Sequence, residues 1–258
     1  MTARRAPQRP AWRQAPDGRA EHRDWLSLVD VTGPFLSLPV LLETWPTLDA
    51  LDADTRERLR EAHGEWLTDP SAFTSAWVAF VLRDLLEWGE DLCTDPERME
   101  ALSIAVREQD VTVAPSFALR DPAAGEETTG GWRLIGFEYE TDVPPTTRLP
   151  GSGWAASPCD RVALLCRGHD VPLGLATNGR WWGLVWAPRG GATATAVFDA
   201  TTWPEVSDRN VVRAFRSLLD RRRFFAVPEQ ERLPALFERS VEGQEDLTEA
   251  LGVQVRRA

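Results

Sequence analysis

The spacing of apolar residues changes near Val111, and this change constrains the fold more than any other feature of the chain. Before this point apolar side chains recur every three or four residues, as at Phe73 and Trp77, which is the period of an amphipathic helix. After it, residues 111–119 and 132–140 alternate in the manner of strands. The order predicts an α+β fold, with a helical lobe followed by a small mixed sheet flanked by helices.

Three segments are expected from this pattern and from the distribution of charge. Residues 1–23 hold six Arg against Asp17 and Glu21 and predict a disordered basic arm. Residues 24–110 are the expected helical lobe, and residues 111–258 are an α/β domain that ends in helices. The arm has no apolar segment typical of a signal peptide, and no apolar run reaches the ~18 residues of a membrane span. We therefore expect a cytoplasmic protein with no membrane partner.

Short signals place the elements within these segments. Asp69-Pro70, Asp95-Pro96 and Ser157-Pro158 each predict a helix start, because Asp and Ser cap helices and Pro suits the first helical position. Asn178-Gly179, between two apolar runs, is the strongest hairpin signal in the chain. Glycines and prolines between 25 and 46 predict short helical turns there. Further elements are a helix up to about Arg107, a strand over 192–199, and helices over about 208–222, over about 229–240 and from 245 to the end.

Tryptophan and cysteine are interpreted as packing residues. Most of the 12 Trp occur at core-like spacings, and the adjacent Trp181 and Trp182 would face opposite sides of a strand. Cys159 and Cys166 lie seven residues apart and would share one helix face. Three cysteines in a chain of this length favour neither a disulfide framework nor a zinc site.

The search for catalytic motifs is negative. There is no GxGxxG, no P-loop, no HExxH and no GxSxG, and the three His match no metal-ligand spacing. A DNA adenine methyltransferase needs an Asn-Pro-Pro-aromatic or Asp-Pro-Pro-aromatic tetrapeptide and a Gly-rich cofactor loop, and both are missing. The sequence therefore predicts no catalytic residue by motif, no metal and no cofactor site in this chain.

Acidic residues at one strand end carry a weaker catalytic alternative. Glu138 and Glu140 alternate onto the same face, and together with Asp121 they could hold a divalent ion in a diverged metal-dependent nuclease. Restriction-type nucleases place an acid on one strand and an acid-x-Lys on the next. All 29 basic residues here are Arg, so such a site would be incomplete or altered. A solvated strand end is the alternative interpretation.

One arginine cluster is the strongest candidate for contact with DNA. Arg221, Arg222 and Arg223 precede two Phe, and Arg suits phosphate binding and stacking. The net charge is −11, but residues 43–108 hold the acid excess, so the later segment is expected to be free to meet a phosphate. The structural alternative is that three Arg at a helix end complement the helix dipole.

Five stretches carry a resemblance to a known family. They are DWLSLVDVTGPFLSLPVLLETWP (24–46), GWAASPCDRVALLCRGHDVPLGLATNGRWWGLVWAP (153–188), TTWPE (201–205), RAFRSLLDRRRFFAVPEQERLPALFERS (213–240) and QEDLTEALGVQVRRA (244–258). Over about residues 24–258 the chain resembles the N-terminal region of large type IIG-like or DISARM-like adenine-N6 DNA methyltransferases of bacterial restriction-modification and phage-defence systems. The ATNGRWW piece also resembles the N-terminal domains of type I restriction subunits, which have a nuclease-like fold.

The resemblance implies three hypotheses. In the first, the chain is a non-catalytic N-terminal fragment whose parent uses S-adenosylmethionine (SAM) in a missing downstream methylase core, and it supports binding of DNA or of defence-system subunits. An apolar stripe of Leu247, Leu251, Val255 and Ala258 at the chain end agrees with a fragment. In the second, the chain is the diverged nuclease, built on a degenerate restriction-nuclease-like core. In the third, it is a stand-alone protein-interaction module.

Overall fold

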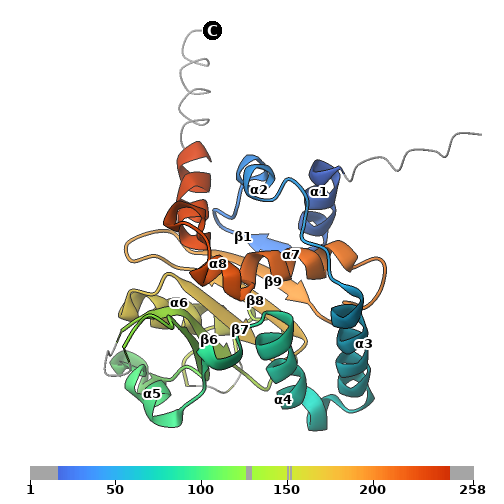
Figure 1. Ribbon diagram of the computed structural model, residues 1–258. Coiled ribbons are helices and arrows are strands. Elements are labelled where there is room, and N and C mark those ends of the chain that lie inside the picture. Colours follow the sequence, from blue (N-terminus) through green and yellow to red (C-terminus); the bar gives the residue numbers. More distant parts are fainter. Residues whose placement is uncertain (1–16, 126–129, 150, 152, 245–258) are drawn as a thin grey trace, which may run out of the picture.

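The computed structural model describes residues 17–125, 130–149, 151 and 153–244, and it arranges them around one mixed β-sheet (Figure 1). The main sheet has seven strands in the order β1-β9-β8-β7-β6-β5-β2, and β3 and β4 form a separate pair. The strands are β1 (Asp30–Thr32), β2 (Leu92–Cys93), β3 (Ile104–Val106), β4 (Val111–Val113), β5 (Phe117–Arg120), β6 (Trp132–Glu138), β7 (Leu173–Thr177), β8 (Trp181–Trp186) and β9 (Ala194–Asp199).

Helices cover both faces of this sheet, so the α+β class predicted from the sequence is confirmed. They are α1 (Gly18–Leu28), α2 (Leu38–Thr44), α3 (Ala53–Thr68), α4 (Pro70–Phe80), α5 (Pro96–Ala101), α6 (Pro158–His169), α7 (Arg209–Leu219), α8 (Arg221–Phe225) and a helix over 233–244. A π-helical turn, Val81–Leu85, continues α4, and 3-10 turns occupy Gly89–Asp91, Arg107–Gln109 and Glu229–Glu231. In the part of the chain that the structure covers, no helix has the length and apolar character that a membrane span requires.

The strands β6 and β7 run parallel and are joined by α6, whereas the other neighbouring strands of the main sheet are antiparallel. The helix α6 begins as predicted: Ser157 and Asp160 form a reciprocal capping box, and Pro158 is the first helical residue. The hairpin from β7 to β8 turns at Asn178 and Gly179, and Gly179 has a positive φ of 87° that favours glycine. Both predictions are confirmed.

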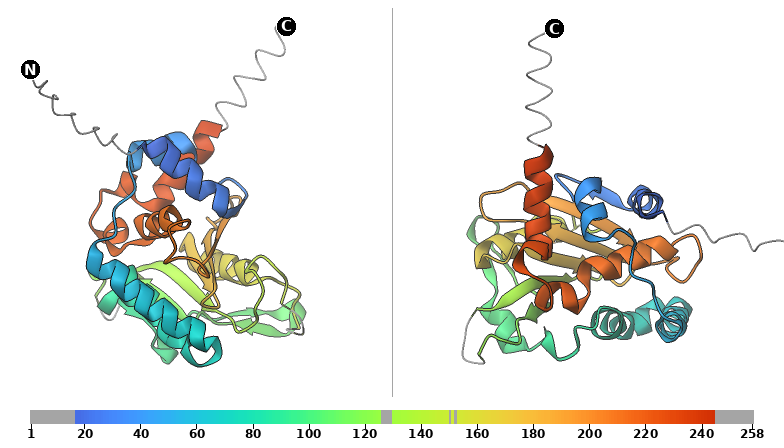
Figure 2. Two further views of the ribbon diagram at one scale, coloured as in Figure 1. Left: turned by 90° about the vertical axis from the view of Figure 1, so that its right-hand side faces the viewer. Right: turned by 45° about the horizontal axis from the view of Figure 1, so that its top comes forward.

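The two faces of the sheet pack against different layers. On one face, Leu175, Leu184 and Phe198 belong to the largest core cluster, together with side chains of α1, α4 and α7. On the other, Ala176 and Val185 pack against α6 (Figure 2). The helix α6 can come this close because β7 carries a glycine, Gly174: a Cβ there would lie 2.0 Å from the Cγ1 of Val162.

A continuous run of aromatic rings, which we call the aromatic seam, crosses the largest cluster. Neighbouring rings have centroids 5.2 to 6.3 Å apart, except that Trp203 and Phe215 lie 4.9 Å apart. The seam consists of Trp66, Trp77, Trp203, Trp182, Phe215, Phe198 and Trp25. It connects α3 and α4 through β8, α7 and β9 to α1, so the five tryptophans of the seam are packing residues, as predicted.

The predicted boundary at residue 110 does not separate two cores. The strand β1 pairs with β9, and β2 pairs with β5, so the first part of the chain supplies both outer strands of the main sheet. The prediction of helical turns over 25–46 missed β1. The helix expected to reach Arg107 ends at Ala101, because residues 104–106 pair with 111–113 instead.

Two predictions concern the ends of the chain. The basic arm was expected over 1–23, but residues 18–23 are the first turns of α1, which Asp17 caps by accepting a hydrogen bond from the backbone N–H of Arg19 at 3.1 Å. Residues 1–16 lie outside the described part of the structure. So do residues 245–258, with the predicted final helix and its stripe of Leu247, Leu251, Val255 and Ala258.

Candidate functional site at the carboxyl ends of β6 and β7

The carboxyl ends of β6 and β7 meet at one edge of the sheet and form a cleft of about 450 Å³. The strands remain in register to the end, since Glu138 lies opposite Thr177 and the N–H of Tyr139 donates to the carbonyl of Thr177 at 3.0 Å. In sheets with parallel strands, this edge is where ligand sites are usually built. The cleft is lined from α3, α4, the segment after β6 and the β7–β8 hairpin.

Glu138 is the last residue of β6. Its backbone N–H donates to the hydroxyl of Ser116 at 2.8 Å, which ties it to the start of β5. Its side chain is exposed at the surface, yet partial desolvation raises the pKa of its carboxyl. Within the described residues, no hydrogen bond or ion pair involves this carboxylate. A carboxyl group of this kind is available for a proton, a cation or a ligand.

Glu140 and Asp142 follow Glu138 and line the cleft opposite Asn178 and Arg180. The Asn178 side chain fixes this arrangement, because its Nδ2 donates to the carbonyl of Thr141 at 2.9 Å. The guanidinium of Arg180 lies 3.5 Å from Asp142 and also 3.5 Å from Asp199. The cleft therefore presents acidic groups beside a cation that is already shared by two carboxylates.

Asp121 is not brought to this site. It follows β5, which runs antiparallel to β6, and its N–H donates to the carbonyl of Gly131 at the opposite end of β6. Six residues of strand separate positions 132 and 138, a distance of roughly 20 Å. Asp121 pairs with Arg133 instead. Burial alone would raise the pKa of Asp121, but the hydrogen bond and the charge of Arg133 outweigh it, and the pKa is lowered.

The arginine cluster is held by protein partners. Arg221 pairs with Asp91 and lies over the Phe225 ring at 5.4 Å. Arg222 pairs with Asp220 at 3.0 Å, and Arg223 lies 4.4 Å from the centre of the Trp45 ring. The three residues are the first three of the five-residue helix α8, which Asp220 caps, and Arg222 and Arg223 also fall in its last turn, where the predicted dipole interaction applies.

The sequence predicted that arginines after residue 110 are free to contact phosphate, and for several of them this prediction is wrong. Acidic residues of the first part of the chain pair with arginines of α7, α8 and the 233–244 helix. The pairs are Glu21 with Arg213, Glu43 with Arg239, Asp49 with Arg222, Glu87 with Arg216 and Asp91 with Arg221. The fold brings the acidic segment onto the basic one, and each partly neutralises the other.

The histidines and cysteines have structural roles. The imidazole Nε2 atoms of His22, His63 and His169 lie 2.7 to 2.8 Å from backbone carbonyl oxygens. Burial raises the pKa of Cys159 and of Cys166 to about 12, so both remain thiols. Among the residues placed by the structure, no three His, Cys, Asp or Glu side chains form a group that could hold a metal ion.

The environment of His63 predicts a loss of stability in mild acid. Burial lowers its pKa below the ordinary value of 6.5, although hydrogen bonds to the backbone of Ala200 and Thr201 oppose the shift. Below pH 6.5 the unfolded chain therefore binds a proton that the folded chain does not, and stability falls as the pH falls towards the folded pKa. Urea denaturation should show this loss. His63→Gln should reduce the slope below pH 6.5 by at most about 1.4 kcal/mol per pH unit; identical slopes would contradict the assignment.

Sequence reasoning found the acidic strand end but missed Asn178 and Arg180 as parts of the same cleft. The Asn178-Gly179 hairpin signal places both residues beside the end of β7, and only the parallel pairing of β6 with β7 brings them to Glu140. The cleft thus combines carboxylates, an amide and a guanidinium at one edge of the sheet. Comparison of the chain with family models, with curated proteins and with solved structures found no match.

Proposed function

We propose that this chain is a non-catalytic N-terminal module of a bacterial DNA adenine-N6 methyltransferase of a restriction-modification or phage-defence system. In this proposal it supports the binding of DNA or of a partner subunit, and SAM binds elsewhere in the parent protein. The proposal rests on the sequence resemblance over residues 24–258, on the missing methyltransferase motifs and on the geometry of the acidic residues.

The arrangement of the acidic residues supports this proposal. Two antiparallel strands, β5 and β6, are followed by α6, the parallel strand β7 and the hairpin to β8, and this order motivates the nuclease alternative. The observation that carries the non-catalytic assignment is the separation of Asp121 from Glu138 along the full length of β6.

The ion pairs of the arginines favour a partner subunit over DNA as the bound molecule. Arg221 and Arg222 would have to exchange Asp91 and Asp220 for phosphates before they could contact a nucleic acid. A chain with a net charge of −11 also repels a polyanion at long range. A partner protein need neither break these ion pairs nor carry the negative charge that the chain repels.

The proposal is tested on the purified chain with SAM, with DNA and with a candidate partner subunit. We expect no heat of binding on titration with SAM and no transfer of a labelled methyl group to DNA. A known adenine methyltransferase, as the positive control, should give a signal in both assays. We expect a complex in gel filtration with a methylase or defence subunit encoded beside this chain. Methylation of DNA by the chain alone would refute the proposal, and so would the absence of both a subunit complex and DNA binding.

A diverged metal-dependent nuclease is the second candidate, and it is favoured by the exposed Glu138 carboxyl, which ends β6 two residues before Glu140 and has a raised pKa. Under this alternative, plasmid DNA is cleaved in the presence of Mg²⁺ or Mn²⁺. Glu138→Gln should then abolish cleavage, whereas Asp121→Asn, about 20 Å away along β6, should leave it intact. Cleavage that is unchanged in Glu138→Gln comes from a contaminant and rejects the alternative.

A further inference from the structure

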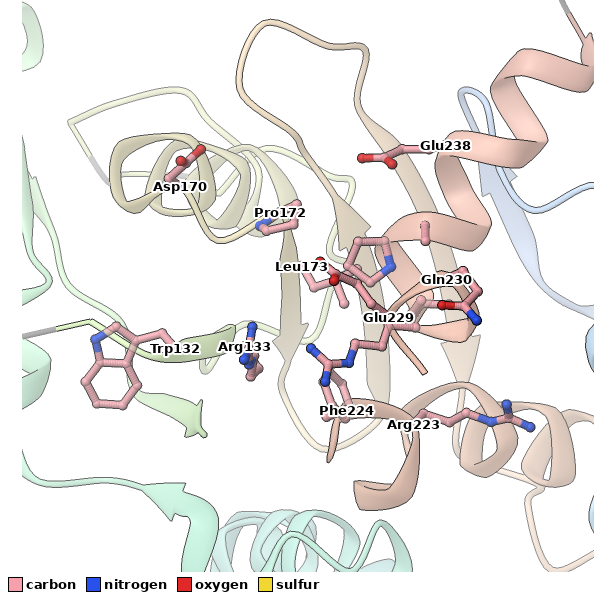
Figure 3. A pocket seen from close by; sticks show the side chains of 14 residues that line it. Trp132, Arg133, Asp170, Pro172, Leu173, Arg223, Phe224, Glu229, Gln230 and Glu238 are labelled. Atoms are coloured by element: carbon pink, nitrogen blue, oxygen red, sulfur yellow. The ribbon is translucent and has the colours of Figure 1, made fainter. Parts of the chain in front are cut away.

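A second cavity, of about 470 Å³, lies at the opposite end of the parallel strands, where β6 and β7 begin (Figure 3). It is enclosed by the first residues of β6, the turn before β7, α8 and the start of the 233–244 helix. Its floor is apolar and includes Pro172, Leu173, Phe224 and Leu233. None of the functions considered above uses it.

Three arginines line this cavity, and one of them, Arg223, lies over the Trp45 ring. Arg133 is paired with Asp121. The side chain of Arg232 takes part in no hydrogen bond or salt bridge within the described residues, and its Nε is buried without a partner. The positive charge of Arg232 also helps to lower the pKa of Asp121, although only Arg133 forms an ion pair with this carboxylate. An unsatisfied buried donor is costly unless a ligand accepts its hydrogen bond.

The start of the 233–244 helix adds to this positive end. Arg232 precedes the helix with extended backbone angles, φ −71° and ψ 151°, and so occupies the capping position. Ser, Thr, Asp or Asn usually accept hydrogen bonds there from the first N–H groups, and an arginine side chain cannot. The first helical residues, Leu233 to Ala235, line the cavity. An anion bound there would meet the positive end of the helix dipole.

Acidic side chains limit the charge that the cavity accepts. Asp170, Glu229 and Glu238 line the cavity and are exposed, and Asp170 and Glu238 lie on the side away from Arg133 (Figure 3). They would repel a long polyanion that crossed the cavity. A compact ligand with one anionic group can reach the arginines and keep its apolar part on Phe224 and Leu173.

We propose that this cavity binds a small organic anion, with a single carboxylate or phosphate group on Arg232 and Arg133 and an apolar body on the floor. The proposal is independent of the proposed methyltransferase-associated function. The anionic head is the shared chemistry, and the experiment distinguishes a carboxylate from a phosphate.

Calorimetric titration with four probes tests the proposal. Benzoate or phenyl phosphate should bind saturably, and whichever binds more tightly identifies the head group. Acetate and inorganic phosphate should bind at least about tenfold more weakly, because they bury no ring against the floor. Arg232→Gln should weaken binding of the aromatic anion about tenfold or more, and Arg232→Lys should weaken it less, because the positive charge remains.

The matched control is Arg58→Gln, which removes the same charge from a surface pair with Asp84 and should leave affinity unchanged. Circular dichroism verifies that each variant is folded; if Arg232→Gln is not, Arg133→Gln carries the same expectation. The proposal is overturned if neither aromatic anion binds saturably to the folded protein. It is also overturned if the folded Gln variant binds as tightly as Arg58→Gln.

Discussion

Asp220→Ala is expected to lower the free energy of unfolding by about 3–5 kcal/mol, because it removes one partner from a buried network of charges. The Asp220 side chain is 2% exposed and accepts hydrogen bonds from the backbone N–H of Arg222 at 2.9 Å and from its Nε at 3.0 Å. It also lies 3.6 Å from Arg216, whose Nε donates to the carbonyl of Leu85 at 3.1 Å. Without Asp220 the buried charge of Arg216 keeps Glu87 as its single ion-pair partner among the described residues.

Asp84→Ala is the matched control for Asp220. It breaks the pair with Arg58, in which the two side chains are 46% and 41% exposed, and it should cost no more than about 1 kcal/mol. Urea denaturation monitored by tryptophan fluorescence measures both changes. Equal losses in the two variants would show that the junction between α7 and α8 is not a buried network.

Trp182→Ala is expected to destabilise the protein by about 3–5 kcal/mol, because it leaves a large void in the aromatic seam. The Trp182 side chain is fully buried, stacks on Trp203 at 6.1 Å and meets Phe215 edge-on at 5.7 Å. Its indole N–H donates to the carbonyl of Gly179 at 3.0 Å, so the substitution also releases the hairpin that borders the cleft. The expected loss of stability includes the loss of this hydrogen bond to Gly179.

The adjacent Trp181 provides the control for this substitution. It faces the opposite side of β8, is half-buried and lies 4.7 Å below the guanidinium of Arg180. Trp181→Ala should cost about 1 kcal/mol, the value of a partly exposed cation–π contact. If the two alanine variants were equally stable, the assignment of these side chains to opposite faces would be wrong.

Elements encoded by neighbouring residues were predictable from the sequence, and elements that depend on distant partners were not. Ser157 and Pro158 determine the start of α6 by local hydrogen bonding, and Gly179 determines the hairpin by its backbone freedom. By contrast, β1 is only three residues long and exists because β9 lies beside it. No periodicity can be recognised in three residues, so the apolar character of the segment predicted helical turns.

The same distinction explains the outcome at the candidate sites. Glu138 was recognised because the alternation of one strand places it, whereas Glu140 follows β6 and does not extend it as predicted. The position of Asp121 depends on the direction in which β5 pairs with β6, and the antiparallel pairing places it at the wrong end. Arg221 pairs with Asp91, 130 positions away in the sequence. Composition and residue spacing give no information about a contact between such distant residues.

The pairing of β1 with β9 has a consequence for the order of events during synthesis. Asp30 lies opposite Val197, and the backbone N–H of Ser37 donates to the hydroxyl of Ser240 at 3.0 Å. The ribosome synthesises α1 and α2 long before β9 and Ser240. Until those segments emerge, the side chains of Trp25 and Phe35 have no core to pack against and stay exposed to solvent. Contacts between residues so far apart in the sequence form slowly, and until they form the incomplete chain exposes aromatic side chains. Binding by chaperones to the nascent chain should therefore concentrate on the segment that holds Trp25 and Phe35.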